Sequence, residues 1–343
     1  MIVEDTKESL EKQLLSACET GKTKEVLKLL SNPIVDPNCV DNSKKRPPFY
    51  IACWKNQIAV MKVLLKDERV DVNKESSDGV SPFFVACING HVELLKLLLN
   101  EKRIETSLNQ FCNTGRTAFF YACETGHTEV VRLLLTDPRI EVNGVWNGQS
   151  PFYIACVNRR SVTLELLLND ERVDINQTNS DGQTPFYIVC EKGYIEVVKL
   201  LLYDQRIDVN RENKRGATPF YVACQEGHLD IVKLLLHNKK VNINKKTDCA
   251  QTPLSIACEN ARMEVVELLL ANEGEVDNGR RTIALDISKQ RANSTQKYDH
   301  ETEEEYQNAK KNCAMIVELL QSYQTNPSQV KSELRKRLDF TGK

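Results

Sequence analysis

The chain has 343 residues, of which 41% are hydrophobic and 27% are charged, and its formal net charge at pH 7 is −2. Because the charge is small and of mixed sign, it gives no electrostatic reason to expect binding to nucleic acid or to a membrane surface. No apolar run approaches the roughly 18 residues that a membrane-spanning helix needs, and the acidic residues 1–11 lack the apolar core of a secretory signal. We therefore expect a chain with no membrane association and no nucleic-acid partner.

A unit of about 34 residues recurs along the chain, and residues 183–210 show it most clearly. Thr184 is suited to cap the start of a helix, and Pro185 follows at the first helical position, where its missing N–H costs nothing. The short helix that begins there is expected to end at Gly193, which fits a left-handed cap. Residues 195–202 then predict a second helix with an apolar stripe. Each unit is therefore predicted to be a pair of helices.

Eight cysteines occupy one position of this unit, at the end of its first helix. They are Cys18, Cys53, Cys87, Cys123, Cys156, Cys190, Cys224 and Cys258. Equivalent atoms of packed neighbouring units should lie about 8–10 Å apart, whereas a disulfide needs Cα atoms within about 7 Å. No C-x-x-C metal-binding spacing occurs. We interpret the eight as small buried packing residues, and the cysteine usage as that of a reduced compartment, the cytoplasm first and the nucleus second.

The motif T-P-x-x-x-A-C, which is followed by G-H and E-V-V-K-L-L-L and returns at this period, resembles the ankyrin repeat. The resemblance covers roughly residues 10–322. It implies an all-α repeat solenoid, in which stacked helix–turn–helix repeats carry β-turn fingers. A solenoid of this kind is a single quasi-one-dimensional domain in which each repeat contacts only its neighbours.

In chain order, we expect four parts. Residues 1–44 form an N-terminal capping repeat and the first finger, because they lack the Thr-Pro motif and have a lysine-rich outer side. Residues 45–280 hold seven ankyrin repeats, and residues 281–325 resemble a degenerate C-terminal capping repeat. An acidic insertion near 291–308 is either disordered or extends the flanking helices. Residues 326–343 form a basic tail, which we expect to be a solvated end rather than a docking segment.

Segments of the type D-E-R-V-D-V-N join each second helix to the next finger. They are one residue longer than the usual join of the family and carry a Val or Ile where glycine is common. We expect the extra apolar residue to pack under the turn.

The sequence holds no phosphate-binding glycine loop, H-E-x-x-H, G-x-S-x-G or kinase signature. We therefore expect no catalysis, no metal and no cofactor. His91, His127 and His228 share one repeat position beside a glycine. Because the position repeats, we interpret them as structural turn residues.

The resemblance places a partner surface, concave in this family, at the residues after each repeat cysteine and at the finger tips. The candidate partner-binding residues are Trp54, Ile88, Phe111, Glu124, Trp146, Val157, Glu191, Arg215 and Gln225. Interface hot spots are enriched in Trp, Tyr and Arg, so both tryptophans are candidate anchors. Packing between neighbouring fingers is the alternative for Phe111 and Trp146.

These features favour a non-catalytic protein–protein interaction scaffold or adaptor, which we expect to be a monomer bound to another protein. The sequence identifies neither that protein nor a pathway. The alternative is a receptor for a small nucleotide-like ligand that stacks on Trp54, Ile88 and Phe111. No matched cluster of phosphate-binding cations accompanies these residues, so the scaffold is the leading hypothesis.

Overall fold

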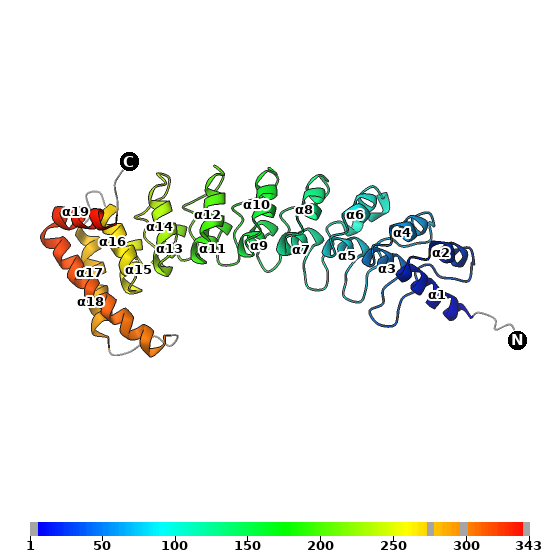
Figure 1. The fold of residues 1–343 in the computed structure, drawn as a ribbon, viewed down its shortest axis with the longest axis horizontal. Helices are drawn as coiled ribbons and strands as arrows, with labels where there is room; N and C mark the ends of the chain where they lie inside the picture. The colour runs from blue at the N-terminus through cyan, green and yellow to red at the C-terminus, as the bar shows by residue number, and fades with distance from the viewer. Residues whose placement is uncertain (1–5, 273–277, 295–300, 339–343) are drawn as a thin grey trace. The chain divides into compact units, whose positions relative to one another are not determined.

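The chain folds into successive helix pairs, shown in the computed structural model of Figure 1. The structure describes residues 6–272, 278–294 and 301–338. It divides into two compact units, residues 1–174 and 175–343, and each is described by itself. Over the described ranges the regular structure is helical, apart from an isolated bridge between Trp146 and Gln149. The prediction of an all-α repeat solenoid is confirmed.

Unit 1, residues 1–174, stacks its helices in two layers. First helices pack on first helices and second helices on second helices, and long loops, which we call fingers, project beside the first helices (Figure 1). The described elements are α1 (Lys7–Thr20), α2 (Thr23–Leu30), α3 (Pro48–Trp54), α4 (Ile58–Leu64), α5 (Pro82–Ile88), α6 (Val92–Leu99), the 3₁₀ helix η1 (Lys102–Ser107), α7 (Ala118–Thr125), α8 (Thr128–Leu135), α9 (Pro151–Val157) and α10 (Ser161–Leu168).

Unit 2, residues 175–343, repeats this layering and ends in longer helices. Its described elements are α11 (Pro185–Glu191), α12 (Ile195–Leu202), α13 (Pro219–Glu226), α14 (Leu229–Leu236), α15 (Pro253–Glu259), α16 (Met263–Asn272), α17 (Asn278–Asn293), α18 (Glu303–Thr325) and α19 (Pro327–Arg337). The acidic insertion extends the flanking helices, since residues 291–293 end α17 and residues 303–308 begin α18. Its residues 295–300 lie outside the described residues.

The basic tail is not a free, solvated end over its described part. Helix α19 packs against α16 and buries Leu334, which is 3% exposed. The Arg335 Nε donates to the carbonyl oxygen of Ala271 at 2.8 Å, and Arg337 forms an ion pair with Glu267. Since Ala271 lies in the last turn of α16, Arg335 satisfies a carbonyl that a helix end leaves without a partner. The expectation of a solvated end is therefore wrong for α19, and residues 339–343 lie outside the described residues.

Six first helices begin at the hydroxyl caps that the sequence predicts. Each cap oxygen accepts a hydrogen bond from the backbone N–H three residues later, at 3.0–3.2 Å. The caps are Ser81, Thr117, Ser150, Thr184, Thr218 and Thr252. Helix α3 begins instead after Pro47, which offers no side-chain acceptor. An N-cap hydroxyl stabilises a helix by about 1 kcal/mol, so the repeated cap fixes where these six helices start.

The eight repeat cysteines lie in the core between helices. All eight are 0% exposed, and all twelve cysteines of the chain are free thiols. The prediction of buried packing residues is confirmed. Burial raises the pKa of the seven repeat thiols from Cys18 to Cys224. The pKa rises to about 12 at Cys18 and well above the usual value at Cys224. Cys249, which lies outside this row, is exposed.

Thiol labelling should therefore separate Cys249 from the repeat cysteines. A thiol reagent at neutral pH should modify about one thiol per chain quickly and the eight repeat thiols only as slowly as the repeats open, because reaction needs an accessible thiolate. Mass spectrometry of the labelled full chain measures both phases. Cys249→Ser should remove the fast phase, and rapid labelling of most repeat cysteines in the folded chain would show that they are not buried.

The joining segments link neighbouring repeats through both apolar and polar residues. Val70 and Ile140 are each 3% exposed, so the apolar residues do pack under the turn as predicted. The polar half of the motif was not predicted from the sequence. Arg139 bonds to the Asp137 carboxylate, and its Nη2 donates to the carbonyl oxygen of Leu99, at the end of the preceding repeat's second helix, at 2.7 Å. The Arg139 guanidinium lowers the pKa of Asp137, despite partial burial.

The asparagine that ends each joining segment forms a second link between repeats. Asn109 Nδ2 donates to the carbonyl oxygen of Arg139 at 2.8 Å, and its Oδ1 accepts from the N–H of Glu141 at 2.8 Å. The same pair of bonds recurs in both units, at Asn38, Asn143, Asn176 and Asn210. Asn73 differs, because the next joining segment, which it contacts, forms the 3₁₀ helix η1 and is not extended. It donates to the carbonyl oxygen of Arg103, but its buried Oδ1 has no hydrogen-bond partner.

This difference predicts unequal costs of removing the two asparagines. Asn109→Ala should lower the free energy of unfolding by about 0.5–1.5 kcal/mol, because it removes two hydrogen bonds between repeats, one part-buried and one exposed. Asn73→Ala is the matched control and should cost less, since it breaks one such bond and removes an acceptor that is already unsatisfied. Urea unfolding of both variants measures the difference. Equal losses would mean that these bonds do not couple the repeats.

Candidate partner-binding surface

The residues that follow the repeat cysteines are held in place by the next repeat. Five of their carbonyl oxygens accept a hydrogen bond from the side chain four positions after the next repeat's cysteine, at 2.6–3.1 Å. The bonds join His91 to Trp54, His127 to Ile88, Arg160 to Glu124, His228 to Glu191 and Arg262 to Gln225. A carbonyl oxygen only accepts, so each histidine carries its proton on Nε2 in this contact. The interpretation of the histidines as structural residues is confirmed.

The irregular fifth repeat keeps this link with different residues. Arg159 stands where glycine is usual and takes a left-handed backbone conformation, with φ 53°. Arg160 stands where histidine is usual, and its Nε donates to the carbonyl oxygen of Glu124 at 3.1 Å. The departure of this repeat from the sequence pattern therefore preserves the position of Glu124.

The side chains of the same row contact the end of their own finger, eight residues earlier. Arg116 forms an ion pair with Glu124 at 3.4 Å. The guanidinium carbon of Arg46 lies 4.6 Å from the Trp54 ring centroid. In unit 2, Gln183 contacts Glu191 at 3.5 Å and Gln251 donates to Glu259 at 2.7 Å. We call the surface formed by these finger ends and first-helix ends the finger–helix face. The eight-residue spacing was visible in the sequence. It brings two side chains into contact only because the finger folds back beside the first helix of its own repeat.

The two tryptophans lie in different environments. Trp54 is half-buried, and its ring is flanked by the Arg46 guanidinium and by Lys55 Nζ, at 4.6 and 4.0 Å. Trp146 stands edge-on to Phe120, with ring centroids 5.8 Å apart, and its Nε1 donates to the carbonyl oxygen of Thr114 at 2.5 Å. Trp146 therefore packs on the preceding finger, whereas the Trp54 ring lies beside two cationic side chains that pair with Asp41 and Glu19.

Arg116 brings two of the candidate residues together in unit 1. Its guanidinium lies 3.9 Å from the Trp146 ring centroid and pairs with the Glu124 carboxylate. Ile88 and Val157, at the ends of α5 and α9, are half-buried. Phe111 is 52% exposed, and Val145, at the same position of the next finger, is 45% exposed. Phe111 was predicted from the sequence and Val145 was not, although both stand two residues after the joining asparagine.

Unit 2 holds a groove of about 540 Å³ on its finger–helix face. It gathers three candidate residues, Glu191, Arg215 and Gln225, together with Glu259. Burial raises the pKa of Glu191 above its usual range. Arg215 is exposed at a finger tip. The candidate residues of unit 2 therefore share one polar groove, whereas those of unit 1 are more apolar.

The floor of this groove is a row of aromatic residues that the sequence analysis missed. Tyr187 and Tyr221 are 4% and 5% exposed, and both line the groove. Asn213 donates to the Tyr187 hydroxyl at 3.2 Å, and the Tyr221 hydroxyl donates to Gln251 at 2.9 Å. Burial raises the pKa of Tyr187 to about 12, so its hydroxyl stays protonated. The Pro-Phe-Tyr that follows the caps Ser150, Thr184 and Thr218 was the available signal.

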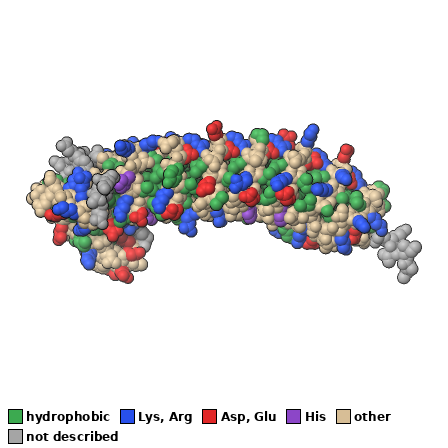
Figure 2. All heavy atoms as spheres, turned by 45° about the horizontal axis from the view of Figure 1, so that its top comes forward, with side chains coloured by type: hydrophobic (Ala, Val, Ile, Leu, Met, Phe, Trp, Pro, Cys, Tyr) green, Lys and Arg blue, Asp and Glu red, His purple; other side chains and the backbone are tan. Residues whose placement is uncertain are grey.

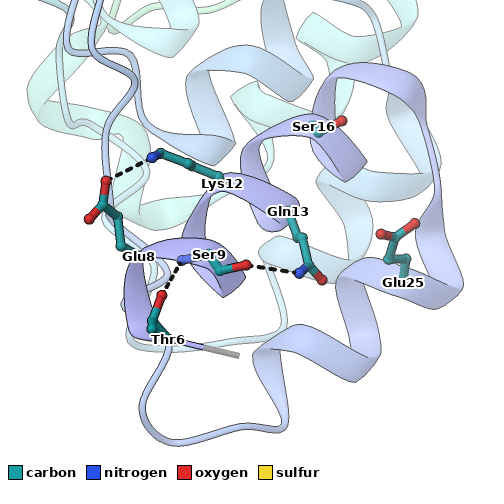
Figure 3. A pocket seen from close by; sticks show the side chains of 7 residues that line it. All are labelled: Thr6, Glu8, Ser9, Lys12, Gln13, Ser16 and Glu25. Atoms are coloured by element: carbon teal, nitrogen blue, oxygen red, sulfur yellow. Dashed lines mark hydrogen bonds and ion pairs between the residues drawn. The ribbon is translucent and has the colours of Figure 1, made fainter. Parts of the chain in front are cut away.

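A second hollow, of about 500 Å³, lies along α1 in unit 1 (Figure 3). Its polar side chains satisfy one another along the helix. Lys12 donates to Glu8 at 2.7 Å, and Gln13 donates to the Ser9 hydroxyl at 3.4 Å. This is the polar outer side that the end of a repeat array needs to remain in solution, and it brings no candidate residue together.

Neither a metal cluster nor a membrane helix is found in the part of the chain that the structure describes. No three His, Cys, Asp or Glu side chains there could hold a metal ion, and no helix there is both long and apolar enough to cross a bilayer. On the face seen in Figure 2, acidic and basic side chains are interspersed with apolar ones. The surface in view therefore has no large area of one charge.

Stacked helix pairs joined by fingers define the chain as a helical repeat array. The family model described as ankyrin repeats (3 copies) matches residues 14–110, 49–145, 103–179 and 152–247, and the model of the single ankyrin repeat matches residues 249–277. The chain belongs to the ankyrin repeat family, whose members generally mediate protein–protein interactions. The comparison with curated proteins gave no match.

Proposed function

We propose that this chain is a non-catalytic interaction scaffold or adaptor that binds another protein on its finger–helix face. One observation carries the proposal: within each unit, the residues after the repeat cysteines form an aligned row. The carbonyls of five are fixed by the following repeat, and their side chains stay partly accessible. A surface held in register before binding loses little conformational freedom on association. A folded partner spanning four or more repeats would use this rigidity.

The partner would meet two kinds of surface. Trp54, Ile88 and the exposed Phe111 offer apolar contacts in unit 1, while Glu191 and Gln225 offer polar contacts in unit 2. Exposed apolar clusters usually mark a binding site, and charged groups mainly set association rate and specificity. Unit 1 is therefore expected to supply most of the binding energy and unit 2 the selectivity.

The small-ligand alternative gains no support from these contacts. A receptor that stacks a nucleotide-like ring needs an open aromatic face, but the Trp54 ring is flanked by Arg46 and Lys55. Trp146 is likewise occupied by Phe120 and Arg116. These contacts favour the scaffold.

Capture of partners from native lysate tests the proposal. The full chain, Trp54→Ala and a control on the second-helix layer, Val162→Ala, are immobilised in equal amounts. Val162 is 54% exposed on α10, so its truncation changes a surface of similar polarity on the other layer. Proteins retained by the unmodified chain and by Val162→Ala, but lost from Trp54→Ala, support the proposal. Equal retention by all three forms would contradict it.

A further inference from the structure

The groove of unit 2 opens where the row of finger-end residues contains a small side chain. In four other repeats a long finger-end side chain contacts the helix end: Arg46 with Trp54, Arg116 with Glu124, Gln183 with Glu191, and Gln251 with Glu259. In the repeat of α13 the same position holds Ala217, eight residues before Gln225. The methyl group of Ala217 lines the groove, and Gln225 donates instead to Glu226 at 2.9 Å. The groove is thus the space that a longer side chain fills elsewhere.

The walls of this space carry three carboxylates, those of Asp181, Glu191 and Glu259, and the two cationic side chains of one finger. Glutamine amides contact the carboxylates of Glu191 and Glu259, so neither carboxylate is neutralised by that contact. The rings of Tyr187 and Tyr221 form the apolar floor. Lys214 and Arg215 line the finger side. A ligand group that donates several hydrogen bonds, carries positive charge and has a flat face would fit the inner wall and the floor.

The chain itself shows which side chain suits this position. In the repeat of α7, Arg116 pairs with Glu124 and lies 3.9 Å from the Trp146 ring centroid. In the repeat of α3, Arg46 lies 4.6 Å from the Trp54 ring centroid. A guanidinium bonds to carboxylates through its fork of donors and also stacks on aromatic rings. An arginine therefore occupies the equivalent space twice within unit 1.

We propose that the groove of unit 2 binds an arginine side chain of the partner protein. The guanidinium enters above Ala217, its donors meet one of the two wall carboxylates, Glu191 or Glu259, and its flat face lies on the tyrosine floor. Lys214 and Arg215 on the finger side favour a partner segment with an acidic residue beside that arginine. This inference rests on the proposed function and names the chemistry that the partner presents to unit 2.

A short peptide pair tests the inference on the full chain. The probe is acetyl-Gly-Arg-Gly-amide, and the control replaces arginine by citrulline, which has nearly the same shape without the charge. Nuclear magnetic resonance follows the side-chain amides of Gln225 and Gln251 during titration. The arginine peptide should shift both amides and bind at least about tenfold more tightly than the citrulline peptide. Equal shifts with both peptides, or no shift with either, would overturn the inference.

Ala217→Arg should block the groove with the chain's own guanidinium, as in the repeat of α7. It should weaken binding of the arginine peptide at least about tenfold. Val80→Arg introduces the same side chain at the same repeat position of unit 1 and should leave that binding unchanged. Thermal unfolding checks that both variants fold. If Ala217→Arg does not fold, the double change Glu191→Gln and Glu259→Gln provides the measurement, with the same expected loss. Unchanged affinity in the folded blocking variant contradicts the inference.

The partner found by lysate capture separates the two proposals. If Trp54→Ala weakens its binding and Ala217→Arg does not, the chain is a scaffold and the arginine inference is wrong. If Ala217→Arg also weakens partner binding at least about tenfold, the arginine inference is supported in the complex. If neither variant changes binding, both proposals fail.

Discussion

Leu201→Ala should lower the free energy of unfolding by about 2–5 kcal/mol, the range for truncating a buried leucine. Leu201 lies in α12 and is 0% exposed. Truncation removes apolar contacts and leaves a cavity that tightly packed neighbours fill only in part. Because repeats are stabilised by their neighbours, the loss should extend from α12 to the helices stacked on it. Urea unfolding of the full chain measures the change.

Tyr203→Ala is the matched control for Leu201→Ala. Tyr203 caps the end of the same helix but is 85% exposed, so its removal should change stability by no more than about 0.5 kcal/mol. Similar losses from both variants would mean that the α12 stripe does not pack as the structure shows.

Trp54→Ala should weaken partner binding by at least about 2 kcal/mol, roughly 30-fold, if Trp54 is a hot spot of the finger–helix face. The same change should cost the free chain only about 1 kcal/mol, because the half-buried ring contacts Arg46 and Lys55 through interactions of that size. Affinity for the captured partner and thermal unfolding are measured on one preparation. Lower stability with unchanged affinity would assign Trp54 to packing.

Trp146→Ala is a less specific variant, because Trp146 also supports the fold. Its contacts with Phe120, Arg116 and the carbonyl oxygen of Thr114 join two neighbouring fingers. Loss of these contacts would change the position of the finger as well as the surface. A binding defect in this variant therefore says less about direct contact than a defect in Trp54→Ala.

The local parts of the fold could be predicted because they depend on neighbouring residues. A Thr followed by Pro starts a helix through its own backbone, so Thr184 and Thr218 were assignable from their short motifs. The cysteine row was assignable from its period, since one position of a stacked repeat keeps one environment. Packing of Val70 followed from the apolar character of the joining segment.

Contacts between distant residues could not be predicted in the same way. The bond from Arg139 to Leu99 joins residues 40 positions apart, and its existence depends on how closely two repeats stack. Docking of α19 through Arg335 depends on where α16 ends. The groove at Ala217 is defined by the side chain that is smaller than its equivalents, which becomes evident only when the finger ends and helix ends are seen together.

The same limit applies to the candidate site. Sequence position identified the row after the cysteines, but the finger-end partners and the tyrosine floor required the folded arrangement. Arg116 contacts both Glu124 and Trp146. Both candidate residues therefore already have a partner within the chain. The repeat pattern therefore predicted the face that carries the candidate residues. The structure showed which of those side chains already contact other residues of the chain.

Amide hydrogen exchange of the full chain, with and without the captured partner, tests the central claim most directly. Binding on the finger–helix face should slow exchange in the fingers, such as residues 109–116 and 143–149, and at the ends of α3 and α5. The exposed sides of α8 and α10 in the second-helix layer should exchange at the same rate in both states. Slower exchange confined to the second-helix layer, with the fingers unaffected, would contradict the account.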